Sequence, residues 1–349
     1  MNVPKLRFKE FNDEYAKLKY KDVLKIKSGK DQKQVEDENG KYPILGTGGQ
    51  IGKTNSFLYD KPSVLIGRKG TINKPQYMES PFWTVDTLFY SHIYEPNIPK
   101  YLFYSFQNVN WKKYDESTGV PSLSSSTIES VECSIPSPNE QIKVANFLSL
   151  LDKKIELQSK KIEDLKLFKK GLLKKQYNYI KNKNLVELSD IANIYQPQTI
   201  AQNKLDNGKY FVFGANGIIG KYSKYNHKQK QITISCRGEN SGKVNITPEE
   251  CWITGNSMVL NIDNNSNVDK LYLKCILDAQ NLRYLISGSG QPQITRRVIL
   301  KHKIPLLPIL EQKKFRNPFI KLDLKILLEE AKVNKLLDIK KGLMQNMFV

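Results

Sequence analysis

The chain has 349 residues, of which 39% are hydrophobic and 26% are charged, and it carries a formal net charge of +20 at pH 7. This length predicts two domains of ordinary size, and the composition excludes a disordered chain. No apolar run approaches the roughly eighteen residues that a membrane-spanning helix needs. The N-terminal segment lacks the apolar stretch of a signal peptide, so we expect a cytoplasmic protein without membrane association. The strong positive charge favours a polyanionic partner, nucleic acid above all.

Disulfide and metal chemistry are not expected. The four cysteines are scattered without a C-x-x-C pair, and the three histidines are isolated from one another. Reduced, mostly buried thiols are typical of such a pattern. We therefore expect no metal site and no other cofactor.

The first 138 residues combine short apolar runs and aromatic residues with Gly, Asn and Pro, which predicts an α+β globule. Within it, Leu45 to Thr54 reads LGTGGQIGKT and resembles a phosphate-binding P-loop. The P-loop pattern would need glycine in place of Thr47, and the pattern G-x-G-x-x-G, started at Gly46, would need glycine in place of Ile51. Both nucleotide patterns fail by one residue.

Residues 139–180 are predicted to form one long charged helix. Apolar side chains recur every three or four residues and mark a single stripe, which is typical of a coiled-coil seam. The stripe comprises Leu148, Leu151, Ile155, Gln158, Ile162, Leu165 and Leu172, with Gln158 as its polar interruption. A helix of about 38 residues, rising ~1.5 Å per residue, spans roughly 57 Å.

Residues 181–310 repeat the first globule. The segments 42–53 and 210–221 align at a distance of 168 residues, and the distance rises to 171 at the Glu-Gln pairs that precede each helix. Between these points we align the strand-like segments 63–70 and 232–238, with Arg68 against Arg237. A spacing that increases slowly and never falls indicates a true internal repeat.

The second copy of the glycine-rich segment reads GANGIIGKY. It retains the shared element G-x-x-G-x-x-G-K but has no P-loop spacing. Glycines at this density mark tight turns or close approach of the backbone. We interpret both segments as scaffold turns and exclude an ATP site.

Residues 311–349 are predicted to form a second helix with the same stripe, each position lying 171 residues after its counterpart. This stripe comprises Phe319, Leu322, Ile326, Glu329, Val333, Leu336 and Leu343. Pro318 interrupts the repeat, and we expect the continuous helix to begin there with Asn317 as its cap. Gly171 and Gly342 lie inside good helical sequence at a cost of ~1 kcal/mol each, which indicates close approach of another backbone or of a partner protein.

Two stripes of one design favour helices that pack on each other, because a long isolated helix needs a partner for its apolar stripe. A twofold relation between the copies would make the helices antiparallel and bring Gln158 close to Glu329. The alternative is that each helix only covers its own globule.

The sequence offers no catalytic centre. Adenine methyltransferases require an Asn/Asp-Pro-Pro-aromatic motif, which neither Ser80-Pro-Phe-Trp83 nor Asn317-Pro-Phe319 provides. Triplets of the D/E-x-K type, such as Asp31-Gln-Lys33, are expected by chance in a chain this rich in lysine.

Cations among aromatic and amide side chains are the chemistry that remains. Such a mixture suits duplex DNA, because Arg and Lys contact guanine edges and phosphates. The candidates are Lys53, Arg68, Lys69, Lys74, Tyr77 and Lys113 in the first copy, and Lys221, Lys224, Tyr225, Arg237, Lys243, Arg296 and Arg297 in the second. For Arg68 and Arg237 the rival interpretation is a buried arginine that pairs with a carboxylate.

The order globule, long helix, globule, long helix resembles the specificity (S) subunit of type I restriction–modification systems. The most specific parts are Ile135-Pro-Ser-Pro-Asn-Glu140-Gln141 and the following helical segment LDKKIELQSKKIEDLKLFKKGLL. The resemblance covers nearly the whole chain. The chain departs from the repeat at Pro318 and in a lead-in to the second helix that is longer than the first.

The resemblance implies a non-catalytic subunit with an α+β fold: recognition domains over 1–138 and 181–310, and spacer helices over 139–180 and 311–349 that form an antiparallel coiled coil. Each domain would read one half of a bipartite site in double-stranded DNA. The helices would dock two methyltransferase (M) subunits, and restriction (R) subunits would join through the assembled complex.

Two other functions stay open. A stand-alone DNA-binding regulator with two half-site readers would need no methylase partner, but off-seam apolar residues such as Phe147, Leu167 and Phe168 favour a docked protein. A self-contained modification enzyme is disfavoured by the absent motif.

Overall fold

The computed structural model describes residues 2–287 and 292–349. The chain forms two compact units, Met1–Ser159 with Ala331–Val349, and Lys160–Glu330. Each unit contains one globule and a segment of each of two long helices. The C-terminal segment of the chain therefore belongs to the first unit.

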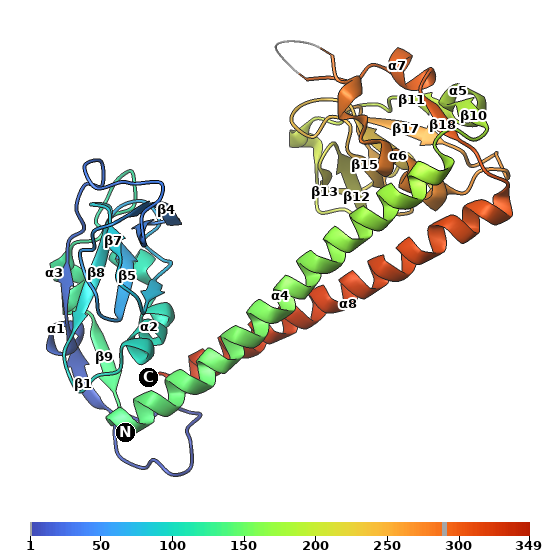
Figure 1. Cartoon of the computed structure of the whole chain (residues 1–349). Coiled ribbons are helices and arrows are strands. Elements are labelled where there is room, and N and C mark those ends of the chain that lie inside the picture. The colour runs from blue at the N-terminus through green and yellow to red at the C-terminus, as the bar shows by residue number, and fades with distance from the viewer. Residues whose placement is uncertain (1, 288–291) are drawn as a thin grey trace. The chain divides into compact units, whose positions relative to one another are not determined.

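The first globule contains three small sheets, with strand orders β2-β8-β5-β6, β4-β3-β7 and β1-β9 (Figure 1). The strand β5 lies inside the largest sheet, and all of its side chains are buried. The strands are β1 (Ala16–Lys19), β2 (Leu24–Lys27), β3 (Tyr42–Gly46), β4 (Gly49–Thr54), β5 (Ser63–Gly67), β6 (Gln76–Met78), β7 (Trp83–Thr84), β8 (Leu88–Ile93) and β9 (Glu132–Ile135). The helices are α1 (Tyr20–Val23), α2 (Pro99–Asn108), η1 (Trp111–Tyr114) and α3 (Ser125–Ser130).

The second globule has the same topology, with strand orders β11-β17-β14-β15, β13-β12-β16 and β10-β18. This agreement confirms the internal repeat. The strands are β10 (Leu185–Glu187), β11 (Asn193–Tyr195), β12 (Tyr210–Gly214), β13 (Gly217–Tyr222), β14 (Ile232–Ser235), β15 (Val244–Ile246), β16 (Trp252–Ile253), β17 (Ser257–Asn261) and β18 (Lys303–Pro305). The helices are α5 (Leu188–Ile191), η2 (Gln202–Lys204), α6 (Lys270–Gln280), η3 (Leu282–Leu285) and α7 (Arg296–Leu300).

The glycine-rich segments are β-hairpins. β3 pairs antiparallel with β4, β12 pairs antiparallel with β13, and each hairpin carries a bulge at the same place. Gly49 and Gly217 close the two turns with φ angles of 113° and 107°, a conformation that favours glycine. Since a strand rather than a helix follows each turn, the interpretation as scaffold turns is confirmed and a P-loop is excluded.

Each globule is joined to its long helix by a buried glutamine. The side-chain oxygen of Gln141 accepts from the Ile98 N–H at 2.8 Å, and its amide donates to the Pro136 carbonyl at 3.0 Å. Gln312 accepts from the Asp269 N–H at 2.8 Å and donates to the Leu307 carbonyl at 2.7 Å. The repeated Glu-Gln motif is therefore a structural junction that satisfies backbone groups on both sides of the helix start.

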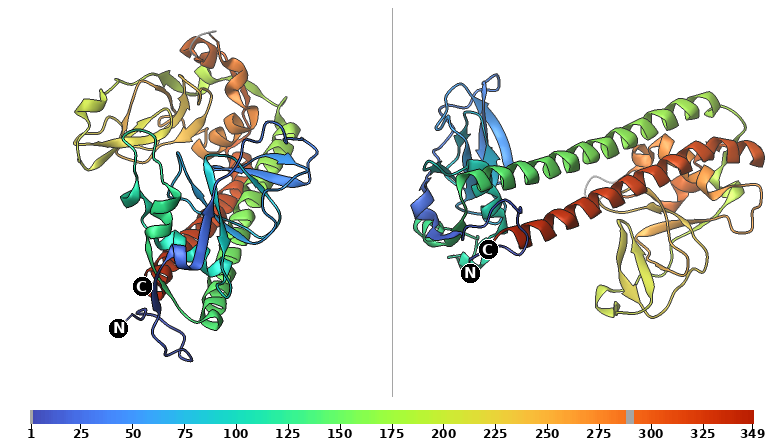
Figure 2. Two further views of the ribbon diagram at one scale, coloured as in Figure 1. Left: turned by 90° about the vertical axis from the view of Figure 1, so that its left-hand side faces the viewer. Right: turned by 90° about the horizontal axis from the view of Figure 1, so that it is seen from below.

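The long helices are α4 (Pro138–Ile180) and α8 (Ile309–Met347). In the second unit they run antiparallel, because Lys161 pairs with Glu329 and Lys169, further along α4, pairs with the earlier Asp323 (Figure 2). In the first unit, Asp152 pairs with Lys340 at 2.6 Å. The pairs Asp152–Lys340 and Asp323–Lys169 are counterparts in the repeat.

The two predicted stripes form the packed sides of these helices. Every residue of both stripes is buried or half-buried. Within each unit the helices also contribute to the globule's core: Leu148 and Met344 in the first, Leu173 and Phe319 in the second. Packing on the other helix and packing on the globule therefore occur together.

The expected start of the second helix is wrong. α8 begins at Ile309 and continues through Pro318, although an interior proline removes one backbone hydrogen bond at a cost of ~3 kcal/mol. Phe315 and Phe319 flank the proline and are buried in the core of the second globule. Burial of two aromatic side chains offsets the lost bond and keeps the helix continuous.

Candidate nucleic-acid interface

Two cations follow the buried strand β5 of the first unit. The backbone of Arg68 is held on both sides: its N–H donates to the Thr87 carbonyl at 2.8 Å, and its carbonyl accepts from the Leu123 N–H at 2.9 Å. Lys69 is exposed and precedes Gly70, which has a φ of 86° and donates to the Pro121 carbonyl at 2.8 Å. The segment is a rigid turn that presents charged side chains beside solvent.

The same hydrogen bonds recur after β14, but not at the aligned residue. Here the N–H of Cys236 donates to the Asn256 carbonyl at 3.1 Å, and the carbonyl of Cys236 accepts from the Ile294 N–H at 3.0 Å. The alignment of Arg68 with Arg237 is therefore wrong by one residue. Cys236 occupies the position of Arg68, and Arg237 occupies that of Lys69. Because each strand is followed by a cation, the sequence alignment can be shifted by one residue without any visible mismatch. The backbone hydrogen bonds give the correct alignment.

Neither strand-end arginine is a buried structural arginine. Arg68 is half-exposed and Arg237 exposed, and neither forms an ion pair with any residue in the described ranges 2–287 and 292–349. By contrast, Arg7 pairs with buried Glu140 and Arg316 pairs with Asp269. The guanidinium groups of Arg68 and Arg237 are thus available for a ligand.

A polar cavity of about 370 Å³ lies beside the turn in the first unit. Arg68 and Lys69 line it together with Glu116 and a row of serines, Ser122, Ser124 and Ser125. The Glu116 carboxylate accepts from the Ser124 hydroxyl at 2.9 Å and from the Thr127 hydroxyl. These hydrogen bonds lower the pKa of Glu116, so the cavity contains a fixed acceptor beside two cations. Sequence reasoning missed Glu116 and the serines, because a short polar loop carries no signal of what it faces.

The other candidates of the first unit are spread over different elements. Lys53 is exposed on the β3–β4 hairpin, and Lys113 is exposed on η1. Lys74 lines a separate cavity of about 570 Å³ that α8 also borders with Lys340 and Lys341.

Tyr77 is packed rather than free to stack on a base. The Lys100 amine lies 4.0 Å from its ring centroid, and the Phe103 ring lies 5.5 Å away. Burial raises the pKa of Tyr77 to about 12. The structure thus supports a packing role for this side chain.

In the second unit, Lys221 is the hairpin counterpart of Lys53 and lies over the ring of Phe211. Lys224, Lys243 and Arg297 are exposed. Tyr225 packs against Tyr210, with the two ring centroids 4.8 Å apart. The Nε of Arg296 donates a hydrogen bond to the Ile194 carbonyl at 2.6 Å. Arg296 also lines another cavity, of about 520 Å³, beside β11.

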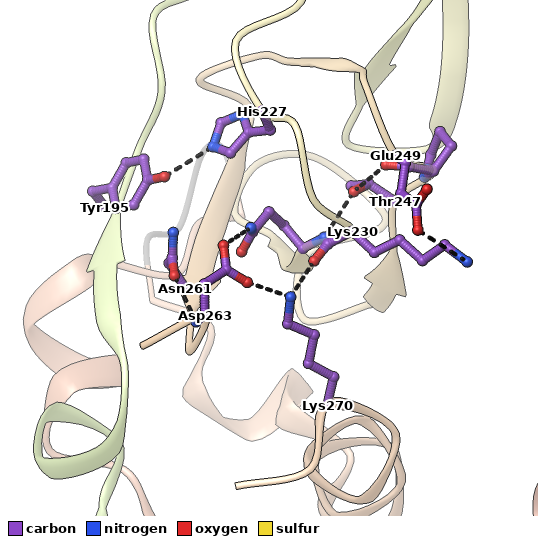
Figure 3. Close-up of polar contacts among 10 residues, drawn as sticks. Tyr195, His227, Lys230, Thr247, Glu249, Asn261, Asp263 and Lys270 are labelled. Carbon is purple, nitrogen blue, oxygen red and sulfur yellow. Dashed lines mark hydrogen bonds and ion pairs between the residues drawn. The ribbon is translucent and has the colours of Figure 1, made fainter. Parts of the chain in front are cut away.

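A polar network that sequence reasoning missed holds the second globule together (Figure 3). Asp263 accepts from the Gln231 amide at 2.6 Å and from the Lys270 amine, which also donates to the Lys230 carbonyl at 2.7 Å. Nearby, the Tyr195 hydroxyl and the His227 ring nitrogen are 2.8 Å apart, and burial lowers the pKa of His227. These side chains bond to one another and to nearby backbone, although the buried Oε1 of Gln231 has no hydrogen-bond partner, and we interpret the network as structural.

Comparison with known proteins supports this architecture. The family model described as "Type I restriction modification DNA specificity domain" matches residues 12–167 and 180–338, which is most of the chain. The chain belongs to this family. As a specificity subunit it has two DNA recognition domains, one for each copy of the repeat, and the resemblance seen in the sequence is confirmed.

This specificity subunit is 25% identical over 289 residues to the type I restriction enzyme MjaVIII specificity subunit of Methanocaldococcus jannaschii, covering 70% of this chain and 68% of that one. It is 24% identical over 160 residues to the EcoDI specificity subunit of Escherichia coli, covering 44% of this chain and 35% of the relative.

The fold is shared with a solved type I restriction–modification S subunit from M. genitalium, with a TM-score of 0.67, 19% identity and 99% coverage of both chains. A second structure, from a study of complex assembly in a type I restriction–modification system, matches with a TM-score of 0.57 at 11% identity, covering 95% of this chain and 96% of that one. No helix in the described ranges is long and apolar enough to cross a membrane.

Proposed function

We propose that this specificity subunit reads a bipartite site in double-stranded DNA, with one half read by each recognition domain. The observation that carries the proposal is the duplicated globule, in which the same turn presents Lys69 in one copy and Arg237 in the other. The net charge of +20 supplies the attraction to phosphates that such binding requires. The recognition domains would span 1–138 and 181–310, and the spacer helices 139–180 and 311–349.

The long helices are proposed to dock methyltransferase subunits, and restriction subunits would join the assembled complex. Large apolar side chains are exposed off the seam on both helices. They include Phe147, Leu157, Leu167 and Phe168 on α4, and Leu327, Leu328, Leu337 and Ile339 on α8. Exposed apolar side chains that share a helix face, such as Leu157 and Phe168 on α4 and Leu328 and Ile339 on α8, mark a protein-binding surface. This surface favours a docked partner over the alternative of a stand-alone regulator.

The helix glycines support the same surface. No other part of the described chain comes within 4 Å of the place where a Cβ would stand at Gly171 or Gly342. Close approach of another backbone of this chain is therefore excluded as the reason for these glycines. Phe168, one helical turn before Gly171, is 59% exposed, and its counterpart Ile339 is 44% exposed. An exposed aromatic side chain next to a glycine, which has no side chain of its own, leaves room for a side chain from a partner protein to pack against the helix.

The activity test compares the purified chain alone with the chain assembled with methyltransferase subunits. We expect the chain alone to bind duplex DNA weakly and to methylate nothing, because its sequence offers no catalytic motif. Transfer of radiolabel from S-adenosylmethionine to DNA is the measurement. Transfer by the chain alone, free of contaminants, would contradict the proposal. Tight, sequence-specific binding by the chain without any affinity for methyltransferase subunits would favour the regulator.

Phe168→Glu is expected to remove one docked methyltransferase subunit and to leave the second, because the repeat provides a second surface around Ile339. A buried aromatic anchor is typically worth ≥ ~2 kcal/mol, about 30-fold in affinity. The mass of the assembled complex by light scattering is the measurement, with the double variant Phe168→Glu/Ile339→Glu expected to bind none. Lys154→Glu changes the charge of an exposed position on the same helix and serves as the control. Unchanged stoichiometry in the double variant would exclude this surface.

A further inference from the structure

In the turn after the buried strand, the two copies have different kinds of residue at the first position, Arg68 and Cys236, and a cation at the second, Lys69 and Arg237. In both, a cation precedes a glycine with positive φ, and this glycine donates to a proline carbonyl: Gly70 to Pro121 at 2.8 Å, Gly238 to Pro292 at 3.0 Å. The cation is Lys69 in one copy and Arg237 in the other, and both are exposed. Lys and Arg share charge but not shape. A position that can hold either lysine or arginine needs only the positive charge. A DNA phosphate is a ligand that requires no more than this.

The preceding position is different in kind. The Arg68 guanidinium donates to the Asp86 carbonyl at 3.5 Å and lines the polar cavity of the first unit. In the second unit, Cys236 is 1% exposed, and its thiol lies 3.8 Å from the carbonyl of Gly255, the counterpart of Asp86. Both side chains therefore point toward the equivalent backbone carbonyl. In the first copy the side chain is a guanidinium that also lines a cavity, whereas in the second it is a buried thiol.

This difference matters because the halves of a bipartite site are read by different domains. Phosphates have the same geometry in every duplex, so phosphate contacts can be the same in both copies. Base edges differ with sequence, so base contacts must differ wherever the half-sites differ. A guanidinium fork matches the O6 and N7 acceptors of guanine in the major groove, whereas a buried thiol contacts no base.

We propose that Lys69 and Arg237 contact DNA phosphates in any sequence, whereas Arg68 reads a guanine in the half-site of the first domain only. The inference rests on the proposed function and assigns separate roles within it. Arg68 is suited to its role because its backbone is hydrogen-bonded on both sides, while its guanidinium makes a long contact of 3.5 Å to the Asp86 carbonyl and is half-exposed. The cavity beside it contains the Ser122 hydroxyl, which can complement a base edge, and the Ser124 hydroxyl, which donates to the Glu116 carboxylate.

The phosphate role is tested on the full chain assembled with methyltransferase subunits, bound to a random-sequence duplex of about 30 base pairs at several salt concentrations. Each lost phosphate contact lowers the slope of log K against log salt by ~0.9. We expect this loss for Lys69→Gln and for Arg237→Gln, and about twice the loss for the double variant. Lys69→Arg, which copies the other domain, is expected to keep the slope, as is Lys154→Gln on α4. An unchanged slope in Lys69→Gln and Arg237→Gln would overturn the phosphate role.

The base-reading role is tested by selecting bound duplexes from a randomised library with the same complex. Arg68→Cys, which copies the second domain, is expected to relax one position of one half-site by about 5- to 150-fold, equivalent to ~1–3 kcal/mol, and to leave the other half unchanged. Lys69→Gln is expected to keep every position. Thermal melting of each variant separates misfolding from lost contacts.

Two results would overturn this assignment: Arg68→Cys retaining full selectivity while folded, or Lys69→Gln relaxing a base position. If the unsubstituted complex selects no sequence at all, the proposed function itself fails. That outcome is distinct from either failure of the residue roles.

Discussion

Glu140→Ala is expected to lower the free energy of unfolding of the first unit by about 3–5 kcal/mol, the cost of removing one partner from a buried ion pair. Glu140 is 1% exposed. Its two oxygens accept from Nε and Nη2 of Arg7 at 2.8 Å each, and the Tyr15 hydroxyl donates to it at 2.9 Å. Truncation would leave the Arg7 charge and the Tyr15 hydroxyl without this acceptor.

The repeat provides a matched control, because Glu311 is the counterpart of Glu140 in sequence but is exposed. Glu311→Ala is expected to change stability by no more than about 0.5 kcal/mol. Urea unfolding followed by tryptophan fluorescence is the measurement, in a Trp252→Phe background so that Trp83 and Trp111 report on the first unit. Equal effects of the two substitutions would contradict the assigned role of the Arg7–Glu140 pair.

Lengthening both spacer helices by one heptad is expected to lengthen the unread gap in the DNA site. Seven residues inserted after Ser159 in α4 and seven after Glu330 in α8 add ~10.5 Å of helix, roughly three base pairs of duplex. Seven-residue blocks retain the pattern of the stripes, so the helices can still pair. The site recognised by the assembled complex, determined by sequencing methylated DNA, is the measurement. An unchanged gap would mean that the helices do not set the distance between half-sites.

Insertion into α4 alone is the control, since it shifts one stripe against the other and should abolish recognition. We continue to predict that Gln158 and Glu329 lie close together and set this register. Glu329 is buried, and Lys161 donates to it at 2.8 Å. A disulfide formed by Gln158→Cys/Glu329→Cys under mild oxidation would support the prediction, and failure to cross-link would count against it.

Patterns that depend on local spacing were determined by the sequence alone. The repeat, the order of globules and helices, and the two seams follow from periodicity along the chain, because side chains spaced by three and four residues share a helix face whatever the tertiary context. The interpretation of the glycine-rich segments as scaffold turns was equally accessible from the sequence. Glycine spacing excluded a phosphate-binding loop, and Gly49 and Gly217 now show positive φ at matching turns.

What depends on partners distant in the chain was decided only by the tertiary structure. Glu140 and Glu311 occupy the same place in the repeat, yet among the residues that the structure describes only Glu140 pairs with an arginine, supplied by a segment more than a hundred residues away. Pro318 remains inside a helix because two neighbouring aromatic rings are buried in a core that the local sequence does not reveal. Arg68 and Arg237 look equivalent along the chain, but hydrogen bonds to remote loops show that Arg237 takes the position in the second copy that Lys69 takes in the first. A shift of one residue changes little in a sequence pattern, whereas in a strand it sends the side chain to the other face, and only the remote hydrogen bonds determine which residue takes the exposed position of the turn.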